Sequence, residues 1–283
     1  GRNVNECRKK NKDEIIYHYT SWAAFEKILR NKSLRLGDLQ SMNDSKESIH
    51  FLKIFEQKIC SMLCEANLEE KIPEARKIIS QVKEDVYINR AYALCFSKSN
   101  DDAAQWERYG QMGRGVCLAF YKCELERQIK VLGFSRIQEV FYLESLDEHK
   151  HLEIFFEFLS EGRSSEFKSL DDWTSNLLAT APAFKHESFE TEREVRLVSL
   201  PLSSNLKQLL KQGTVKKEYE SKEDRLRSYI EINLPHIEEC IAQIIIGPRS
   251  RQPEDELNKI LIDWEYPILA SKNCIYRSEC PLR

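Results

Sequence analysis

Acidic and basic side chains alternate in an unusual way around residue 194. If this segment is a strand, its period of two places Glu192, Glu194 and Arg196 on one face, at a repeat of about 7 Å. Val195 and Leu197 then face the core. Glutamate has a low propensity for strands, so two such residues in a row indicate a role beyond packing, and a neighbouring arginine can hold a carboxylate ionised. The alternative is an edge strand whose charged face prevents aggregation.

A histidine lies within the first apolar segment, Ile15–Ser21, whose β-branched and aromatic residues predict a short strand. Thr20 or Ser21 can cap a helix that begins near Trp22. A neutral imidazole close to such a strand-to-helix turn can hydrogen-bond a ligand hydroxyl. His18 is therefore a candidate binding residue, and the alternative is a core histidine satisfied by the backbone.

Two aromatic residues and a serine form a third group. Ser97 ends the apolar segment 91–97, so its hydroxyl is expected at the edge of a sheet. Trp106 and Tyr109 are three residues apart in a predicted short helix and share a face. The two rings can stack on a planar ligand such as a base or nicotinamide. The alternative is that both rings pack this helix onto the sheet.

Two polar turns are weaker candidates. Asn43 and Asp44 follow the first helix–strand unit and can line the same cleft, although Asn-Asp is also ordinary turn chemistry. Arg249 follows an apolar segment and can contact a phosphate or simply lie on the surface. The sequence leaves both alternatives open.

Composition narrows the class of protein. The chain has 283 residues, of which 41% are hydrophobic and 31% charged, and its formal net charge is -3. These values are typical of a soluble globular protein, and the net charge argues against bulk electrostatic binding of nucleic acid without excluding a local basic groove. No apolar run approaches the roughly 18 residues that a membrane helix needs. Residues 1–14 are polar, lack the apolar core of a secretory signal, and are expected to form a flexible N-terminus.

The cysteines predict a reduced, cytoplasmic protein without a metal site. There are nine of them, an odd number, and none forms a CxxC pair. Cys60 and Cys64 are one helical turn apart, but no matching Cys/His pair completes a zinc site.

The elements that must position these residues follow from apolar periodicity, caps and breakers. Helices are predicted at 22–31, 47–68, 74–88, 101–110, most of 149–183, 236–242 and 253–262. Strands or extended segments are predicted at 15–21, 34–36, 91–97, 115–121, 140–143, within 189–200, and at 229–234, 244–246 and 268–271. The charged segment 207–227 predicts a solvated loop or helix face. Short strands that do not alternate with helices favour an α+β fold of two small packed sheets with a helical insertion.

The order and spacing of short motifs resemble a bacterial family known as domain of unknown function 2971, over nearly the whole chain from residue 15. The motifs are YHYTS (17–21), MND..E (42–47), CFS (95–97), W..YG (106–110), GVCLAF (115–120), ETEREVRLV (190–198), IIIGPR (244–249) and YRSECPLR (276–283). That family is itself similar to ADP-ribosyltransferase-like proteins, which include DNA-modifying toxins. The resemblance implies a split β core in one domain over 15–283, with helical insertions around 47–90 and 149–183.

The resemblance also implies roles for individual residues. In the histidine-led version of these proteins, His18 holds a ribose of the co-substrate NAD, and Glu194 stabilises positive charge on the sugar being cleaved. Glu192 would position or deprotonate the acceptor. The middle position is assigned to Tyr109, which would stack on the nicotinamide, with Ser97 as its rival. The remaining expected NAD-binding residues are Tyr19, Thr20, Asn43, Trp106 and Arg196.

The function implied is NAD-dependent ADP-ribosylation of a nucleic acid or protein, as in a bacterial toxin or anti-phage defence effector. Such a protein would be cytoplasmic, would need no metal or membrane, and would have an antitoxin or defence-system partner. The first alternative is an NAD glycohydrolase that uses water as the acceptor in the same pocket. The second is a catalytically silent module that senses a nucleotide or a phage protein, because fold does not settle chemistry.

Overall fold

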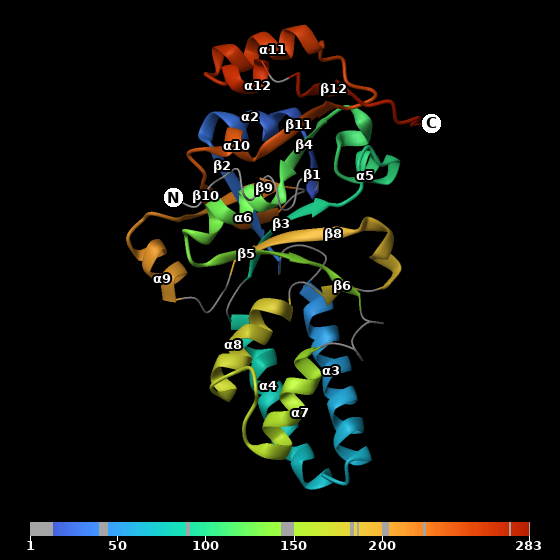
Figure 1. Ribbon diagram of the computed structural model, residues 1–283, viewed down its shortest axis with the longest axis vertical. Helices are drawn as coiled ribbons and strands as arrows, with labels where there is room; N and C mark the ends of the chain where they lie inside the picture. Colours follow the sequence, from blue (N-terminus) through green and yellow to red (C-terminus); the bar gives the residue numbers. More distant parts are fainter. Residues whose placement is uncertain are drawn as a thin grey trace.

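A computed structural model describes residues 14–39, 45–88, 91–142, 150–181, 184–185, 187–199, 204–222, 225–271 and 273–282. Within these ranges the chain forms a sheet of ten strands, a second sheet of two strands, and eleven α-helices (Figure 1). The predicted α+β class is confirmed. The predicted pair of small packed sheets is wrong, because most strands pair into one continuous sheet.

The ten-stranded sheet is built almost entirely from antiparallel pairs. Its main path runs β12-β11-β4-β1-β3-β2-β10-β9, while β8 pairs with β3 and β5 pairs with β8. Only β11 and β12 are parallel among the described pairs of this sheet. The strands are β1 (Ile15–Thr20), β2 (Ser33–Asp38), β3 (Tyr92–Ser97), β4 (Val116–Tyr121), β5 (Ser135–Glu139), β8 (Glu194–Ser199), β9 (Lys216–Lys222), β10 (Arg225–Asn233), β11 (Ile241–Ile246) and β12 (Ile275–Arg277).

The sheet is split along one edge of β3. At one end of that edge, Tyr17 of β1 lies opposite Ser97. At the other end, Gly37 of β2 lies opposite Ala93. Residues 94–96 have no strand partner on this edge in the described part of the sheet, whereas the opposite edge of β3 is paired with β8 along its length. An opening therefore remains where β1 and β2 diverge from each other.

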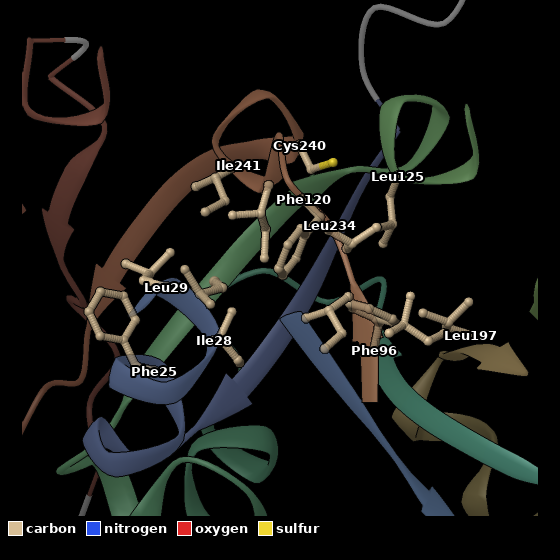
Figure 2. Packing of buried hydrophobic residues seen from close by; sticks show 14 of the residues in the cluster. Phe25, Ile28, Leu29, Phe96, Phe120, Leu125, Leu197, Leu234, Cys240 and Ile241 are labelled. Atoms are coloured by element: carbon tan, nitrogen blue, oxygen red, sulfur yellow. The ribbon is translucent and has the colours of Figure 1, made fainter. Parts of the chain in front are cut away.

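Helix α2 (Trp22–Asn31) connects the two strands that diverge. It begins at Ser21, whose hydroxyl accepts a hydrogen bond from the amide of Ala24, and it ends at Lys32 in the left-handed conformation. Its buried face carries the apolar residues of the predicted amphipathic pattern, and the predicted bounds are confirmed. Figure 2 shows this face meeting side chains of the sheet in one cluster; the residues from α2 are Phe25, Ile28 and Leu29. Burying each such side chain contributes about 1.5–3 kcal/mol.

Shorter helices lie around the ten-stranded sheet. They are α5 (Ala103–Arg108), the 3-10 turn η2 (Gln111–Gly113), α6 (Lys122–Lys130), α9 (Ser204–Lys211), α10 (Ile237–Cys240), α11 (Glu254–Asp263) and α12 (Pro267–Ser271). In Figure 1, α11 and α12 lie beside β12 at one end of the molecule. Helix α5 is capped by the Asp102 carboxylate, which accepts from the amide of Gln105.

Four helices form a second core at the other end of the molecule. They are α3 (Ser45–Glu65), α4 (Ile72–Ile88), α7 (Lys150–Glu161) and α8 (Leu170–Thr180), with a 3-10 turn η1 (Glu69–Lys71) between the first two. Figure 1 shows them side by side below β8 and β5. Their apolar cluster contains stacked rings, including Phe155 on Trp173 with centroids 4.4 Å apart. The helices predicted in the two insertions are confirmed.

A short parallel ladder connects these helices to the ten-stranded sheet. It consists of β6 (Phe141–Tyr142) and β7 (Phe184–Lys185). The ring of Phe184 stacks on Phe51 of α3, with centroids 3.7 Å apart. The next residue, Lys185, is therefore anchored where the chain leaves the helices and approaches β8.

Several predicted elements differ from the structure. The strand near residue 194 begins only at Glu194, because residues 187–192 form the 3-10 helix η5 (Glu187–Glu192) and Arg193 has a φ of 46°. The segment 207–227 continues α9 and then forms most of the β9–β10 hairpin, in which cross-strand pairing outweighs its charge. Residues 268–271 are helical rather than extended. Helix α6 and strands β5 and β12 were not predicted from the sequence. The predictions for residues 1–13 and for Asn43 lie outside the described residues.

No helix in the described ranges is both long and apolar enough to cross a membrane. Among the cysteines that the structure describes, none takes part in a disulfide.

Gly115, directly before β4, lies in a closely packed region beside the split. A Cβ added at Gly115 would collide with the backbone oxygen of Thr20, and that of Gly110 would lie only 3.0 Å away. Both obstacles are backbone atoms and cannot rotate away. We expect Gly115→Ala to lower the free energy of unfolding by about 3 kcal/mol or more, measured by urea denaturation.

Gly213→Ala is the matched control, because Gly213 has a φ of +70° and nothing lies within 4 Å of an added Cβ. It should cost about 1–2 kcal/mol from backbone strain alone. Equal losses for the two variants would contradict this description of the packing at Gly115.

Candidate functional site

The opening in the sheet contains a pocket of about 550 Å³. Strand β1, helix α2, strand β2 and the middle of β3 contribute to its wall, together with the end of α5 and strand β9. Its lining comprises His18, Thr20, Ser21, Ala23, Ala24, Lys27, Ile28, Ser33, Arg35, Leu94, Arg108, Tyr109, Gln111 and Glu220. The split described above therefore produces a cavity that is large enough for a small organic ligand.

His18 presents one acceptor nitrogen in this pocket. Its Nδ1 lies 3.0 Å from the carbonyl oxygen of Cys95, in the unpaired stretch of β3. A carbonyl only accepts, so Nδ1 must carry the proton. Burial lowers the pKa of His18, against the opposing effect of this hydrogen bond, and the ring is neutral at pH 7. Nε2 is then left as a hydrogen-bond acceptor, suited to a ligand hydroxyl.

Three cationic side chains line the pocket: Lys27, Arg35 and Arg108. Arg35 is held by Glu231, with Nε 3.2 Å from Oε2, and its guanidinium lies 4.5 Å from the ring centre of Tyr229. Glu220 is the one acidic residue among the described lining residues. A fixed guanidinium is well matched to phosphate oxygens, so this wall favours an anionic ligand.

Arg108 and Tyr109 lie at the boundary between the pocket and a buried charged cluster. Both line the pocket, and Arg108 donates to Glu192 at 2.5 Å. Burial, followed by the negative charge of Glu192, raises the pKa of Tyr109 to about 12, so its hydroxyl stays protonated. Gln111 and Met112, which follow Gly110, have φ angles of 51° and 56°, a conformation that costs energy and often occurs at functional sites.

The cluster itself consists of Lys185, Glu192, Glu194 and Arg196, and we call it the carboxylate cluster. The Lys185 ammonium lies 2.7 Å from Glu192 and 3.0 Å from Glu194, and the Arg196 guanidinium lies 2.6 Å from Glu194. Burial alone would raise the pKa of Glu194. The charges of Arg196 and Lys185, with hydrogen bonds from Arg196 and Cys95, outweigh that effect and lower the pKa to about 2.

The pocket and the carboxylate cluster lie on different faces of the sheet. Ser97 is opposite Glu194 and Phe96 is opposite Val195, so Glu194 shares its face with Ser97. The His18 ring approaches Phe96 instead, with centroids 5.7 Å apart. Neither Glu192 nor Glu194 is among the described residues that line the pocket. The structure therefore brings His18, Thr20 and Tyr109 together, and places both carboxylates behind Arg108 and Tyr109.

The predicted alternation on the strand is correct only in part. Glu194 and Arg196 share a face and form an ion pair, as expected. Glu192 precedes the strand and reaches the cluster from η5. The edge-strand alternative is wrong, because β8 lies between β3 and β5 and all six of its residues are buried.

The aromatic residues of the predicted site lie in two different environments, a small core and the pocket wall. Trp106 is fully buried, donates from Nε1 to Asp101 at 2.8 Å, and packs edge-on against Tyr19 with centroids 4.9 Å apart. Its position favours the packing alternative over stacking on a ligand. Tyr19 belongs to the same small core and donates to the carbonyl of Ser99. Tyr109 remains half-exposed beside the pocket.

Two further candidates have structural roles. Ser97 is buried and donates to the backbone carbonyl of Glu192 at 2.8 Å, so it fixes the turn before β8 rather than lining the pocket. Arg249 donates to the carbonyl of Leu282 and lies outside the described pocket lining. In the part of the chain that the structure describes, no group of three His, Cys, Asp or Glu side chains is placed to hold a metal ion.

Four residues of the site were not predicted from the sequence: Lys27, Arg35, Arg108 and Lys185. Lys27 sits one helical turn after Ala24 on the exposed side of α2, a position that looks like ordinary surface charge. Arg108 lies between Trp106 and Tyr109, and this position within the motif was the one local indication that it could belong to the site. Lys185 precedes Glu192 by seven residues, and no local pattern connects the two.

Fold and site together define a mixed α+β protein whose largest sheet is split around a cationic pocket. Residues 105–197 match the family described as Protein of unknown function (DUF2971). This match supports the family predicted from the motifs, and it spans Tyr109 and the carboxylate cluster, whereas His18 lies before it. No curated protein and no solved structure matches the chain.

The low pKa of Glu194 predicts how stability depends on pH. An acid whose pKa is about 2 in the folded protein, against a usual value of 4.5, stabilises the fold above pH 4.5 and loses that contribution as the pH falls towards 2. Glu194→Gln removes this dependence. We expect the loss of unfolding free energy between pH 7 and pH 3 to be smaller in the variant by about 2 kcal/mol, measured by urea denaturation.

Glu26→Gln is the control, since Glu26 is exposed and its ion pair among the described residues is with Arg30, one turn away on α2. Its acid dependence should match that of the unmodified protein. If Glu194→Gln also behaves like the unmodified protein, the ion pairs of Glu194 do not stabilise the fold.

Proposed function

We propose that this protein is an NAD-dependent ADP-ribosyltransferase that acts on a macromolecule, and that the pocket in the split sheet binds NAD. The observation that carries the proposal is the neutral His18 facing a cavity whose wall holds three cations. Ribose hydroxyls suit the acceptor Nε2, and the diphosphate suits Lys27, Arg35 and Arg108. The family resemblance points to the same ligand.

The chemistry needs negative charge next to the sugar. Breaking the bond between nicotinamide and ribose develops positive charge on the ribose, and a fixed carboxylate stabilises it. Glu194 is ionised over the whole physiological range. Glu192 is the carboxylate connected to the pocket wall, through Arg108, and would orient or deprotonate the acceptor.

Arg108 and Tyr109 must move for this reaction, because they separate the pocket from both carboxylates. A diphosphate in the pocket competes with Glu192 for the Arg108 guanidinium, and so favours that movement. Tyr109 can then stack on the nicotinamide. By its resemblance, we place the protein among bacterial toxins or anti-phage effectors, with a nucleic acid or protein as acceptor.

A binding module without turnover is the second candidate. It is favoured by the absence of both glutamates from the described pocket lining, and by the cations that already neutralise them. Such a module would bind a nucleotide through His18 and the cationic wall alone. An NAD glycohydrolase, with water as the acceptor, would use the same pocket as the transferase.

The first test is NAD binding. His18→Ala removes the acceptor nitrogen and should weaken NAD binding about tenfold, the equivalent of one hydrogen bond of about 1.4 kcal/mol, measured by isothermal titration calorimetry. His236→Ala is the control, because His236 is exposed and lies outside the described pocket lining, and it should bind NAD normally. Equal affinity for NAD in both variants would place the ligand elsewhere.

The second test separates the three functions. The protein is incubated with NAD labelled on the adenylate and with cell lysate, and the label is followed into protein, nucleic acid and free ADP-ribose. The transferase proposal expects label on a macromolecule, and expects Tyr109→Ala to reduce it at least tenfold through lost stacking and positioning. Free ADP-ribose alone would identify a glycohydrolase. Binding without any product would identify a silent module.

Tyr219→Ala is the matched control for the label assay. Tyr219 is an exposed aromatic residue on β9 that does not line the pocket in the described structure. Its removal should leave label transfer unchanged. An equal loss of transfer in Tyr109→Ala and Tyr219→Ala would show that the effect of Tyr109→Ala does not come from the pocket.

A further inference from the structure

Lys185 lies where two carboxylates would otherwise meet in the protein interior. Its ammonium bridges Glu192 Oε2 and Glu194 Oε2, and the side chains of all three residues are only 6% exposed. Two buried carboxylates that share a site without a cation cannot both stay ionised. Arg108 and Arg196 each pair with one of these carboxylates, and Lys185 is the cation that pairs with both.

The backbone alone does not align the two carboxylates. Glu192 ends the 3-10 helix η5, Glu194 begins β8, and Arg193 between them has a φ of 46° that breaks the strand period. Each oxygen of Glu192 has its own cation: Oε1 accepts from Arg108 at the pocket wall, and Oε2 accepts from Lys185. Glu192 is thus fixed between the wall of the pocket and the carboxylate of the strand.

The four-helix core holds Lys185 in place. Lys185 pairs with Tyr142 in the β6–β7 ladder, and the adjacent Phe184 is buried among the helices against Phe51. Neighbouring residues in a strand point to opposite sides. One side of this short strand is therefore anchored in the helices while the other delivers an ammonium to the carboxylate cluster.

We propose that Lys185 is a positioning residue for the reaction at this site: it keeps Glu192 and Glu194 ionised together and orients Glu192 towards Arg108. This inference rests on the proposed function for its catalytic meaning, but the arrangement of charge that it describes does not. Within the described part of the chain, the charged and titratable groups that face the two carboxylates are Lys185, Arg108, Arg196, Tyr109, Tyr142 and Cys95.

The test compares variants that remove or keep the charge at residue 185. Lys185→Met and Lys185→Gln remove it, and the second keeps a hydrogen-bond donor in case the first does not fold. Lys185→Arg keeps it. Lys98→Met is the matched control, because Lys98 pairs with Glu139 in a partly exposed site next to β3.

Two readouts are measured. The first is carboxyl ¹³C NMR titration of glutamate-labelled protein without NAD, with the two resonances assigned through Glu192→Gln and Glu194→Gln. In the neutral variants one of the two carboxylates should titrate about one to three pH units higher than in the unmodified protein, while Lys185→Arg and Lys98→Met should not shift. The second is the pH profile of NAD turnover, whose acid limb should move with that shift and return in Lys185→Arg.

Each result has a defined meaning. Unchanged titration of Glu192 and Glu194 in the neutral variants would overturn the inference, whatever the turnover. If the carboxylate titration shifts but the acid limb of the NAD turnover profile does not move, Lys185 has only a structural role. That result would overturn the positioning role. An unmodified protein that binds NAD without turning it over would contradict the proposed function, and the titration would still decide whether Lys185 holds the carboxylates ionised.

Discussion

The candidate site in this protein depends on an incomplete pairing along one edge of strand β3. Strands β1 and β2 both pair with the same side of β3, at opposite ends, and leave its middle unpaired on that side. Exposed backbone groups in a sheet normally demand a partner. Here the imidazole of His18 satisfies the carbonyl of Cys95 in the gap, and by doing so it is fixed in one tautomer beside a cavity. The same hydrogen bond therefore satisfies the sheet at its split and leaves Nε2 of His18 as an acceptor beside the cavity.

The second constraint is the burial of charge. The carboxylate cluster brings two acids, a lysine and an arginine into the interior, where an unpaired charge would cost several kcal/mol. Because Lys185 comes from the strand that follows the helices, the four-helix core and the ten-stranded sheet meet at this cluster. Loss of one partner would leave the others uncompensated, so the cluster ties the two parts of the fold together.

The sequence predicted local structure well where local signals decide it. Helix α2 has its serine cap, its apolar stripe and its bounds as predicted, and the strand around His18 was expected from its β-branched and aromatic residues. Prediction from the sequence failed where a single backbone angle or a partner distant in the sequence decides the local structure. Because Arg193 has a left-handed φ, Glu192 lies outside the strand. The carboxylate of Glu192 is nevertheless linked to that of Glu194, because Lys185 pairs with both. Tertiary pairing also turned the charged segment 207–227 largely into a hairpin, which no local pattern indicated.

The most direct measurement is a crystal structure of the protein with an NAD analogue whose glycosidic bond cannot be cleaved. The account predicts that a ribose hydroxyl lies within hydrogen-bond distance of His18 Nε2, that the diphosphate contacts Arg35 or Arg108, and that the Arg108–Glu192 contact is lengthened. An analogue bound at another surface, or a pocket left empty at saturating analogue, would contradict it.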